Sequence, residues 1–367
     1  MVDPEWVARS RALPLAIAPG ALTDRFIREV SDGFDRYRKR NDIERWDDSG
    51  RVRCSKWLPA RPQGGAYGMW NWGDWNFPTY QDDTKGCDAW GNLEYDTTLV
   101  LALGFVATRR PELYEAMVVA ARHFMDVDTI HFQARRPEWV GMNHPKNPLH
   151  FSFELGGVDL GHTWSEGLLA YYYLTGDERG LDGARGIADY LERRLGRGII
   201  AANPRQLGWP QIALLAVHEA TGERRYLDAA HEYARRGMRA HPPGSVRHWK
   251  HGILADALAY THAATHDAEI EQWLRVYVKS VGGRRAQRDA RLLPATAYVA
   301  ALTGDASLRA VALQGAERLG LGGWGKPFTL NGRLGFRLYS LLGEPSTDKP
   351  HAAETPSVSP SPAASPR

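Results

Sequence analysis

The chain has 367 residues, 43% of them hydrophobic, which is enough to bury a large core in one or two domains. Its net charge of +3 is too small to indicate a nucleic-acid or membrane-surface partner. No run approaches 18 apolar residues, so no membrane span is expected. The first residues lack the basic and then apolar order of a signal peptide. We therefore expect a cytoplasmic protein, or a secreted one if this sequence is part of a longer exported protein.

Residues 1–20 show no clear period and are interpreted as an N-terminal extension. From 21 to 343 two kinds of helical run alternate, forming the predicted catalytic domain. Charged, amphipathic runs lie at about 22–38, 111–126, 178–195, 224–240, 267–280 and 305–319. More apolar runs lie at about 93–107, 163–174, 209–220, 252–264, 292–302 and 331–342. Residues 344–367 are rich in Pro, Ser and Ala, which predicts a disordered tail.

A short phrase separates each apolar run from the amphipathic run that follows it. Leu-Thr-Gly-Asp at 174–177 recurs as Ala-Thr-Gly-Glu at 220–223, Ala-Thr-His-Asp at 264–267 and Leu-Thr-Gly-Asp at 302–305. The threonines at 175, 221, 265 and 303 are therefore 46, 44 and 38 residues apart, the spacing of a repeated helical hairpin. A degenerate copy lies at 107–112. Gly suits the left-handed residue that ends one helix, and an acid favours the start of the next.

Six apolar and six amphipathic helices in strict alternation predict an all-α fold, a closed (α/α)6 toroid with the apolar helices inside. An open solenoid is the competing interpretation, but it would tolerate any number of repeats. The connections from each outer helix to the next inner helix are long and must lie together on one face. They span about 60–92, 127–162, 196–208, 241–251, 281–291 and 320–330. Functional residues collect on loops held by a rigid scaffold, so the site is expected there.

The first loop combines aromatic residues with carboxylates. Asp74 stands among Trp70, Trp72 and Trp75, where it is either a shielded general acid or the cap of a turn beside Gly73. Beyond it, Asn92 is a natural N-cap of the first inner helix. Glu94 and Asp96 then fall in the first turn, where the helix dipole favours acids.

The second loop places His144, Lys146 and His150 within seven residues that also contain two prolines. His and Lys can carry protons near neutral pH, but these residues can equally be solvated loop side chains. Their spacing matches no helical metal pair, although a metal site with a ligand from elsewhere stays open. Further on, Thr163 and Glu166 form a predicted capping box, and His162 precedes it, facing the mouth of the ring.

The remaining loops carry basic and aromatic residues that suit an anionic sugar. Arg205, Arg247, His248, Lys250 and Lys326 supply the positive charge, unless they form surface salt bridges. Flat aromatic rings at the rim of a cleft suit the apolar faces of sugars, although they can also pack the loops together. The candidate substrate-binding residues are Trp72, Tyr80, Trp90, Asn92, Arg205, Trp209, His248, Trp249, Lys250 and Trp324.

With these residues in view, the chain resembles the α/α-toroid domain of the exo-rhamnogalacturonan lyase-like family. The resemblance is carried by Tyr67-Gly68 with Trp72-Gly73-Asp74, by residues 90–94, by the 144–150 loop and by residues 171–179. It covers about residues 60–200, and the hairpin pattern continues to about 342. The resemblance implies a six-hairpin carbohydrate-active enzyme acting on a rhamnogalacturonan-like glycan.

The first hypothesis is a polysaccharide lyase that cleaves a uronate-containing glycan by β-elimination. Arg205, Lys250 or a histidine would hold the carboxylate, His144 or Lys146 would be the base, and His150, His162 or Tyr80 the acid. The alternatives are a glycoside hydrolase with two carboxylates, and a non-catalytic glycan-binding helical-repeat module. The hydrolase carboxylates would come from Asp74, Asp88, Asp96 and Glu154. We expect no cofactor; Ca²⁺ is possible, but no motif indicates it. The expected partner is an anionic poly- or oligosaccharide.

Overall fold

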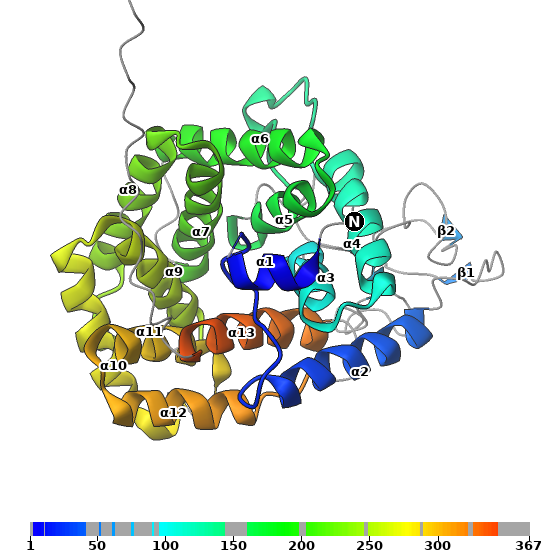
Figure 1. The fold of residues 1–367 in the computed structure, drawn as a ribbon. Helices are drawn as coiled ribbons and strands as arrows, with labels where there is room; N and C mark the ends of the chain where they lie inside the picture. Colours follow the sequence, from blue (N-terminus) through cyan, green and yellow to red (C-terminus); the bar gives the residue numbers. More distant parts are fainter. Residues whose placement is uncertain are drawn as a thin grey trace, which may run out of the picture.

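The computed structural model describes residues 3–10, 12–41, 51–52, 61–62, 75–76, 90–91, 95–143, 160–197, 203–245, 249–286, 289–321 and 326–343. Thirteen α-helices lie in these ranges, and twelve of them form two concentric rings (Figure 1). The inner helices are α3 (Thr97–Thr108), α5 (Glu166–Thr175), α7 (Pro204–Thr221), α9 (Lys250–Thr265), α11 (Leu293–Thr303) and α13 (Lys326–Leu342). The outer helices are α2 (Asp24–Asn41), α4 (Pro111–His123), α6 (Glu178–Leu195), α8 (Arg224–Ala240), α10 (Ala268–Ala286) and α12 (Ala306–Glu317).

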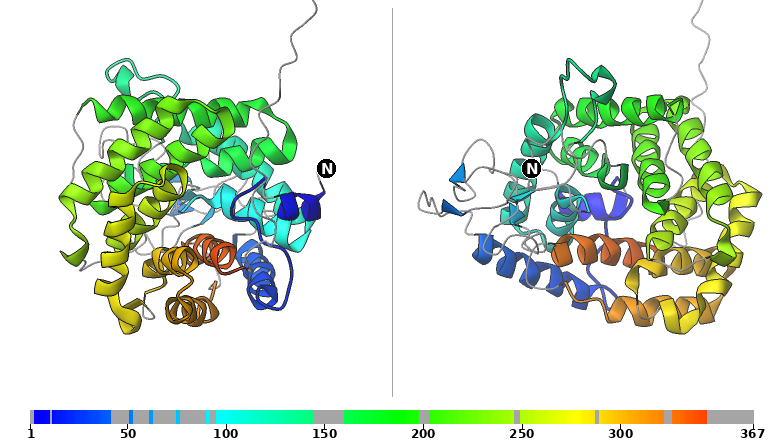
Figure 2. Two further views of the ribbon diagram at one scale, coloured as in Figure 1. Left: turned by 60° about the vertical axis from the view of Figure 1, so that its left-hand side comes forward. Right: turned by 180° about the vertical axis from the view of Figure 1, so that it is seen from behind.

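The rings close because the last inner helix meets the first elements of the chain. Helix α13 packs against both α2 and α3, and the views from the side and from behind show the same closed arrangement (Figure 2). The predicted toroid is therefore confirmed, and an open solenoid is excluded. None of the described helices is long and apolar enough to cross a membrane.

The apolar runs form the inner helices and the amphipathic runs form the outer helices, as predicted. Helix α3 buries every residue from Thr97 to Ala107, since neighbours surround it on all sides. Helix α8 instead buries a single stripe, with Tyr226, Ala230, Tyr233 and Gly237 recurring every three or four residues. Charged residues cover the rest of α8 and face solvent.

The Thr-Gly-Asp phrase ends one helix and starts the next through local hydrogen bonds. The Thr175 hydroxyl donates to the carbonyl of Tyr171 at 2.7 Å and accepts from the amide of Asp177 at 3.1 Å. Gly176 has a φ of 75°, in the left-handed region that favours glycine. The Asp177 carboxylate then caps α6 by accepting from the amide of Arg179 at 3.1 Å. Each step uses residues of the phrase or its own turn, so the hairpin is encoded locally.

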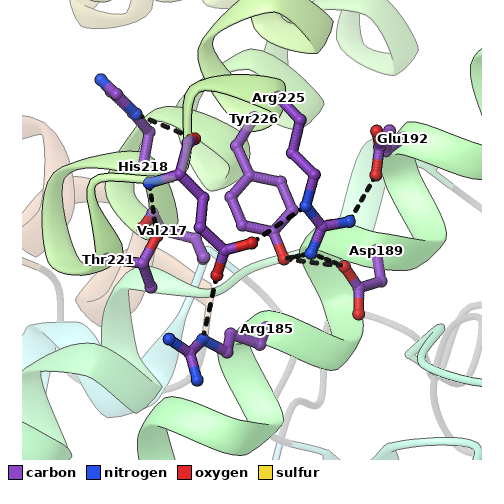
Figure 3. A network of polar contacts seen from close by, with 9 residues as sticks. Arg185, Asp189, Glu192, Val217, His218, Thr221, Arg225 and Tyr226 are labelled. Atoms are coloured by element: carbon purple, nitrogen blue, oxygen red, sulfur yellow. Dashed lines mark hydrogen bonds and ion pairs between the residues drawn. The ribbon is translucent and has the colours of Figure 1, made fainter.

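Outer helices α6 and α8 are also joined through charged side chains (Figure 3). The guanidinium of Arg225 lies 2.7 Å from the carboxylates of Asp189 and Glu192 on α6 and 2.9 Å from that of Glu223. The Tyr226 hydroxyl donates to Asp189 at 2.7 Å. This network fixes one hairpin of the ring against the next.

The N-terminal residues, expected to show no period, contain helix α1 (Pro4–Ser10), which packs against α3. Residues 12–15, which we call the strap, follow α1 and cross the end of the ring where the inner helices finish. Val7, Leu13, Leu15 and Ile17 are each at most 5% exposed. This segment is therefore packed onto the ring. Its individual apolar residues hold it there, although they show no regular spacing in the sequence.

Four two-residue strands interrupt the long connection before α3. Strands β1 (Arg51–Val52) and β2 (Arg61–Pro62) form one antiparallel pair, and β3 (Trp75–Asn76) and β4 (Trp90–Gly91) form another. The predicted tail, residues 344–367, lies outside the described residues.

Candidate functional site

The inner helices α5, α7, α9, α11 and α13 begin at the same end of the ring, which we call the loop end. A cationic and aromatic cluster lies there around Trp249, whose side chain is half-buried. The Arg291 guanidinium carbon is 4.4 Å from the centre of the Trp249 ring, and that of Arg205 is 5.3 Å from it. The Lys250 Nζ lies 6.0 Å from the same ring. Three cations therefore surround one aromatic ring, within the range of cation–π attraction.

His162 holds Arg205 in this cluster. The Arg205 Nη2 lies 3.0 Å from the His162 Nε2 and donates to the Gly161 carbonyl at 2.8 Å. Because a guanidinium has only donors, the His162 Nε2 accepts and carries no proton. His162 is 4% exposed and sits in a short 3₁₀ turn, Leu160–His162. The geometry fits a histidine that orients an arginine.

Beneath this cluster, on the ring axis, five charged side chains form a buried network that we call the hub: Asp96, Glu166, Asp256, Arg333 and Arg337. Arg333 pairs with Glu166, and its Nη1 lies 4.0 Å from the Asp96 Oδ2. Arg337 pairs with Asp256 at 2.9 Å. Each buried charge thus has an opposite charge beside it, as burial requires.

Aromatic rings complete the surroundings of Arg333. Its guanidinium lies 5.4 Å from the Trp164 ring centre and 5.0 Å from that of Trp209. These two indoles meet edge to face at 4.5 Å, and Tyr95 packs against both with ring centres 6.1 Å apart. The Arg333 Nη1 and the Trp209 Nε1 are buried donors without a hydrogen-bond partner among the described residues.

Asp96 is the N-cap of α3 and also contacts α5. Its Oδ1 accepts from the Leu99 amide at 3.1 Å and its Oδ2 from the Gly167 amide at 2.9 Å. A Cβ at position 167 would overlap the Asp96 carboxylate, so this close approach requires glycine. Burial raises the pKa of Asp96 to about 6, with the nearby Arg333 opposing the rise and Glu166 adding to it.

These contacts correct three predictions about helix starts. Helix α3 begins at Thr97 with Asp96 as its N-cap, so neither Asn92 as cap nor Asp96 in the first turn is right. The N-cap of α5 is Ser165, so the capping box of Thr163 and Glu166 is wrong. The Thr163 hydroxyl donates to the Met142 sulfur at 3.7 Å instead. Asp96 caps α3 and also reaches α5, while Glu166 pairs with Arg333 in the hub instead of completing a capping box.

A further correction concerns the connection predicted at 196–208. Helix α7 begins at Pro204, with Asn203 capping it, so Arg205 lies in the first helical turn. Trp209 lies one turn further on and is 5% exposed, so it packs against the hub residue Arg333 and does not line an open rim.

Five of the predicted site residues come together at the loop end: His162, Arg205, Trp209, Trp249 and Lys250. Nine lie outside the described residues: Trp72, Asp74, Tyr80, Asn92, His144, Lys146, His150, His248 and Trp324. Arg247, Asp88 and Glu154 lie outside them too, and only the backbone of Trp90 and Lys326 is described. In the described part of the chain no group of His, Cys, Asp and Glu is placed to hold a metal ion.

The sequence interpretation missed Arg291, Asp256, Arg333 and Arg337 as parts of this end of the ring. A signal for the last three was present, because each is a charge inside an apolar inner run. Arg333 and Arg337 are four residues apart and therefore share one face of their helix.

Two family models match this chain. The model described as "PcRGLX-like protein C-terminal alpha/alpha toroid domain" matches residues 59–189. The model described as "Beta-L-arabinofuranosidase, GH127 catalytic domain" matches residues 159–242. The chain contains a carbohydrate-active α/α toroid. The first match confirms the resemblance found in the sequence, and both matches include His162 and the hub residue Glu166. No curated protein matches the chain.

Proposed function

We propose that this toroid is an enzyme that binds an acidic, uronate-bearing glycan at the loop end and cleaves it by β-elimination. The observation that carries the proposal is the cluster of Arg205, Lys250 and Arg291 around Trp249. An indole offers a flat apolar face to a sugar ring, and guanidinium groups bind carboxylates through two parallel hydrogen bonds. The Trp249 ring supplies the first kind of contact. Arg291 already pairs with the Asp289 carboxylate through hydrogen bonds of 2.8 and 2.9 Å, so the second kind of contact is assigned to Arg205.

Arg205 fits the role of binding the uronate carboxylate. His162 and the Gly161 carbonyl fix one end of its guanidinium, so little side-chain freedom is lost when a ligand binds. The positive charge of Arg205 beside the carboxylate stabilises the carbanion-like state that forms when the neighbouring carbon loses its proton.

The elimination needs a base and an acid as well as a cation. The base removes the proton beside the carboxylate, the electron pair forms a C=C bond, and the glycosidic C–O bond breaks. The acid then gives a proton to the departing oxygen. We assign these proton transfers to His144, Lys146 and His150, whose loop precedes the 3₁₀ turn that bears His162 in the sequence. A rhamnogalacturonan-like backbone is the proposed substrate, on the strength of the toroid match.

A glycoside hydrolase is the second candidate, because the arabinofuranosidase catalytic-domain model matches the segment that includes Glu166. Hydrolysis needs two carboxyl groups that can reach the sugar. In the described hub, Glu166 and Asp256 are paired with arginines, and Asp96 accepts two backbone hydrogen bonds. The hub carboxylates are thus already engaged, and Asp74, Asp88 and Glu154 lie outside the described residues. The preference for elimination therefore rests on the cations around Trp249.

A panel of pectin, glycosaminoglycan and alginate substrates tests the proposal. Elimination produces an unsaturated uronate that absorbs in the ultraviolet together with each new reducing end. Reducing ends without that absorbance would establish the hydrolase instead. Binding without any product would indicate a glycan-binding module.

A further inference from the structure

A cavity lies on the ring axis toward the turn end, where the inner helices finish and the strap passes. Its volume is about 500 Å³, which is in the range of small-molecule sites. Helices α3, α5, α7, α9 and α13 line it together with the strap. It is distinct from the loop-end cluster, since Trp249, Arg205 and Lys250 are not among its walls.

The walls of this cavity are largely apolar. Leucine and isoleucine side chains come from three inner helices, and small residues leave the open space. These wall residues are Leu99, Leu103, Leu169, Ala170, Ile212, Leu215, Ala216, Ala263 and Ala264. Ala263 and Ala264, at the end of α9, are exposed to the cavity and its opening.

Most of the charges at the cavity are neutralised by protein partners. Glu166 pairs with Arg333, and Arg337 pairs with Asp256. The His218 Nδ1 donates to the Glu223 carbonyl at 3.0 Å. Glu219, one residue further along α7, is an exposed glutamate that forms no hydrogen bond or ion pair with any described side chain.

Glu219 therefore supplies a negative charge that the described residues leave unbalanced. Glu219 lines the cavity and is exposed to solvent, yet the neighbouring protein is dense enough that partial burial raises its pKa. The nearby Glu166 raises that pKa further, and His218 opposes the rise. The Tyr173 ring lines the same cavity, and burial raises its pKa, with Glu219 adding to the rise.

We propose that this cavity binds a compact organic cation, with the ammonium group on Glu219 beside Tyr173 and the apolar body among the leucines. A carboxylate and an aromatic ring next to apolar walls are the groups that recognise an alkylammonium ion. An anion would face Glu219, and a sugar would bury its hydroxyl groups against leucine side chains without partners. The inference does not depend on the proposed reaction at the loop end.

The probe is cyclohexylammonium chloride, titrated into the full chain by calorimetry or ligand-observed NMR. Cyclohexanol and cyclohexanecarboxylate are the matched neutral and anionic probes. We expect the ammonium ion to bind at least about tenfold more tightly than either, because an ion-paired hydrogen bond contributes ~1.5–3 kcal/mol. Equal binding of cyclohexanol would overturn the assignment of a cation.

Glu219→Gln should weaken binding of the ammonium ion by about tenfold or more, since it removes the negative charge and keeps the shape of the side chain. Glu115→Gln on outer helix α4 is the matched control. Glu115 is an exposed glutamate that does not line the cavity, so this substitution should leave binding unchanged. Ala263→Phe should block the cavity and abolish binding. If Glu219→Gln binds the probe as the wild type does, the proposal is wrong, whatever happens with Ala263→Phe.

Discussion

Arg333 of α13 forms a buried ion pair with Glu166, the first residue of α5, although α3 lies between these two helices in the ring. The contact joins residues 167 positions apart and places a cation beside the rings of both Trp164 and Trp209. The side chain of Arg333 is 5% exposed and that of Glu166 is 13% exposed. Removing one partner would leave the other charge buried, so this pair is sensitive to mutation.

Arg333→Met should lower the free energy of unfolding by about 3–5 kcal/mol, the usual cost of breaking a buried pair. Urea denaturation followed by circular dichroism measures it. Arg224→Met on α8 is the matched control, because the Arg224 side chain is 83% exposed and its pair with Asp228 is long, at 3.6 Å. Combining Arg333→Met with Glu166→Gln should restore part of the loss. Similar losses of stability for Arg333→Met and Arg224→Met would refute the central role of Arg333.

Asp96 should make stability depend on pH between about 4 and 7. Its pKa is raised from the ordinary 3.8 to about 6, so the folded protein holds this proton more tightly than the unfolded chain. The contribution is fullest below pH 3.8 and is lost as the pH rises through 6. A rise of about two in this pKa corresponds to about 3 kcal/mol of the free energy of unfolding.

The comparison of wild type with Asp96→Asn isolates this effect, since asparagine resembles the protonated acid. Other acids, such as Asp177 and Asp267, have lowered pKa values and contribute the opposite trend to both proteins. Relative to wild type, Asp96→Asn should gain about 3 kcal/mol in urea denaturation between pH 4 and pH 7. A difference that does not change with pH would show that Asp96 stays ionised.

Gly176→Ala should destabilise the fold by about 1 kcal/mol, because its φ of 75° is unfavourable for alanine. A Cβ there would meet no atom within 4 Å, so the cost is purely backbone strain. Gly196→Ala is the control: Gly196 ends the next helix with an ordinary φ of −71°, and alanine there should stabilise by about 0.4–1 kcal/mol. Thermal melts of the two variants should therefore shift in opposite directions, and a shift in the same direction would contradict the account of the turn.

The rings could be predicted from the sequence because their signals are local. The hydroxyl of Thr175 and the carboxylate of Asp177 bond within a few residues, so the repeated phrase encodes the turn by itself. The alternation of apolar and charged runs then decides which helices lie inside.

The hub could not be predicted because its partners are distant in sequence. Glu166 looked like half of a capping box with Thr163, and only the folded ring brings Arg333 to it. Asp96 likewise looked like a first-turn acid, whereas its second acceptor oxygen serves the Gly167 amide of another helix. The positive φ of 58° at both Tyr95 and Asp96 delays the start of α3, and nothing in the local residue pattern indicates that geometry.

Arg205→Gln should weaken binding of an acidic oligosaccharide by about tenfold or more, since a hydrogen bond to a charged group contributes ~1.5–3 kcal/mol. Binding of a neutral glycan should change little. Arg197→Gln is the matched control, because Arg197 is an exposed arginine at the end of α6 that pairs with Glu138 at 3.7 Å. Titration at two salt concentrations should show that added salt weakens the wild type more than Arg205→Gln. Equal losses of affinity for acidic and neutral ligands would show that Arg205 does not bind the carboxylate of the ligand.

His144→Ala and His150→Ala should each reduce the rate of product formation by ~10²–10⁴-fold, the usual contribution of a general acid or base. His162→Ala should act differently. Its Nε2 accepts from Arg205, so its loss should free the guanidinium and raise KM for the acidic glycan more than it lowers kcat. Initial rates followed by ultraviolet absorbance, with circular dichroism to verify folding, separate the two effects.

Asp74→Asn is the control for the competing chemistry, because a hydrolase would need that carboxylate and a lyase would not. Under the proposed elimination it should retain most of the wild-type rate. If Asp74→Asn abolishes turnover, the products are saturated and both loop histidine variants keep near-normal rates, then carboxylates perform the chemistry. The cations around Trp249 would in that case bind the substrate of a hydrolase, and Arg205→Gln would still weaken an acidic ligand more than a neutral one.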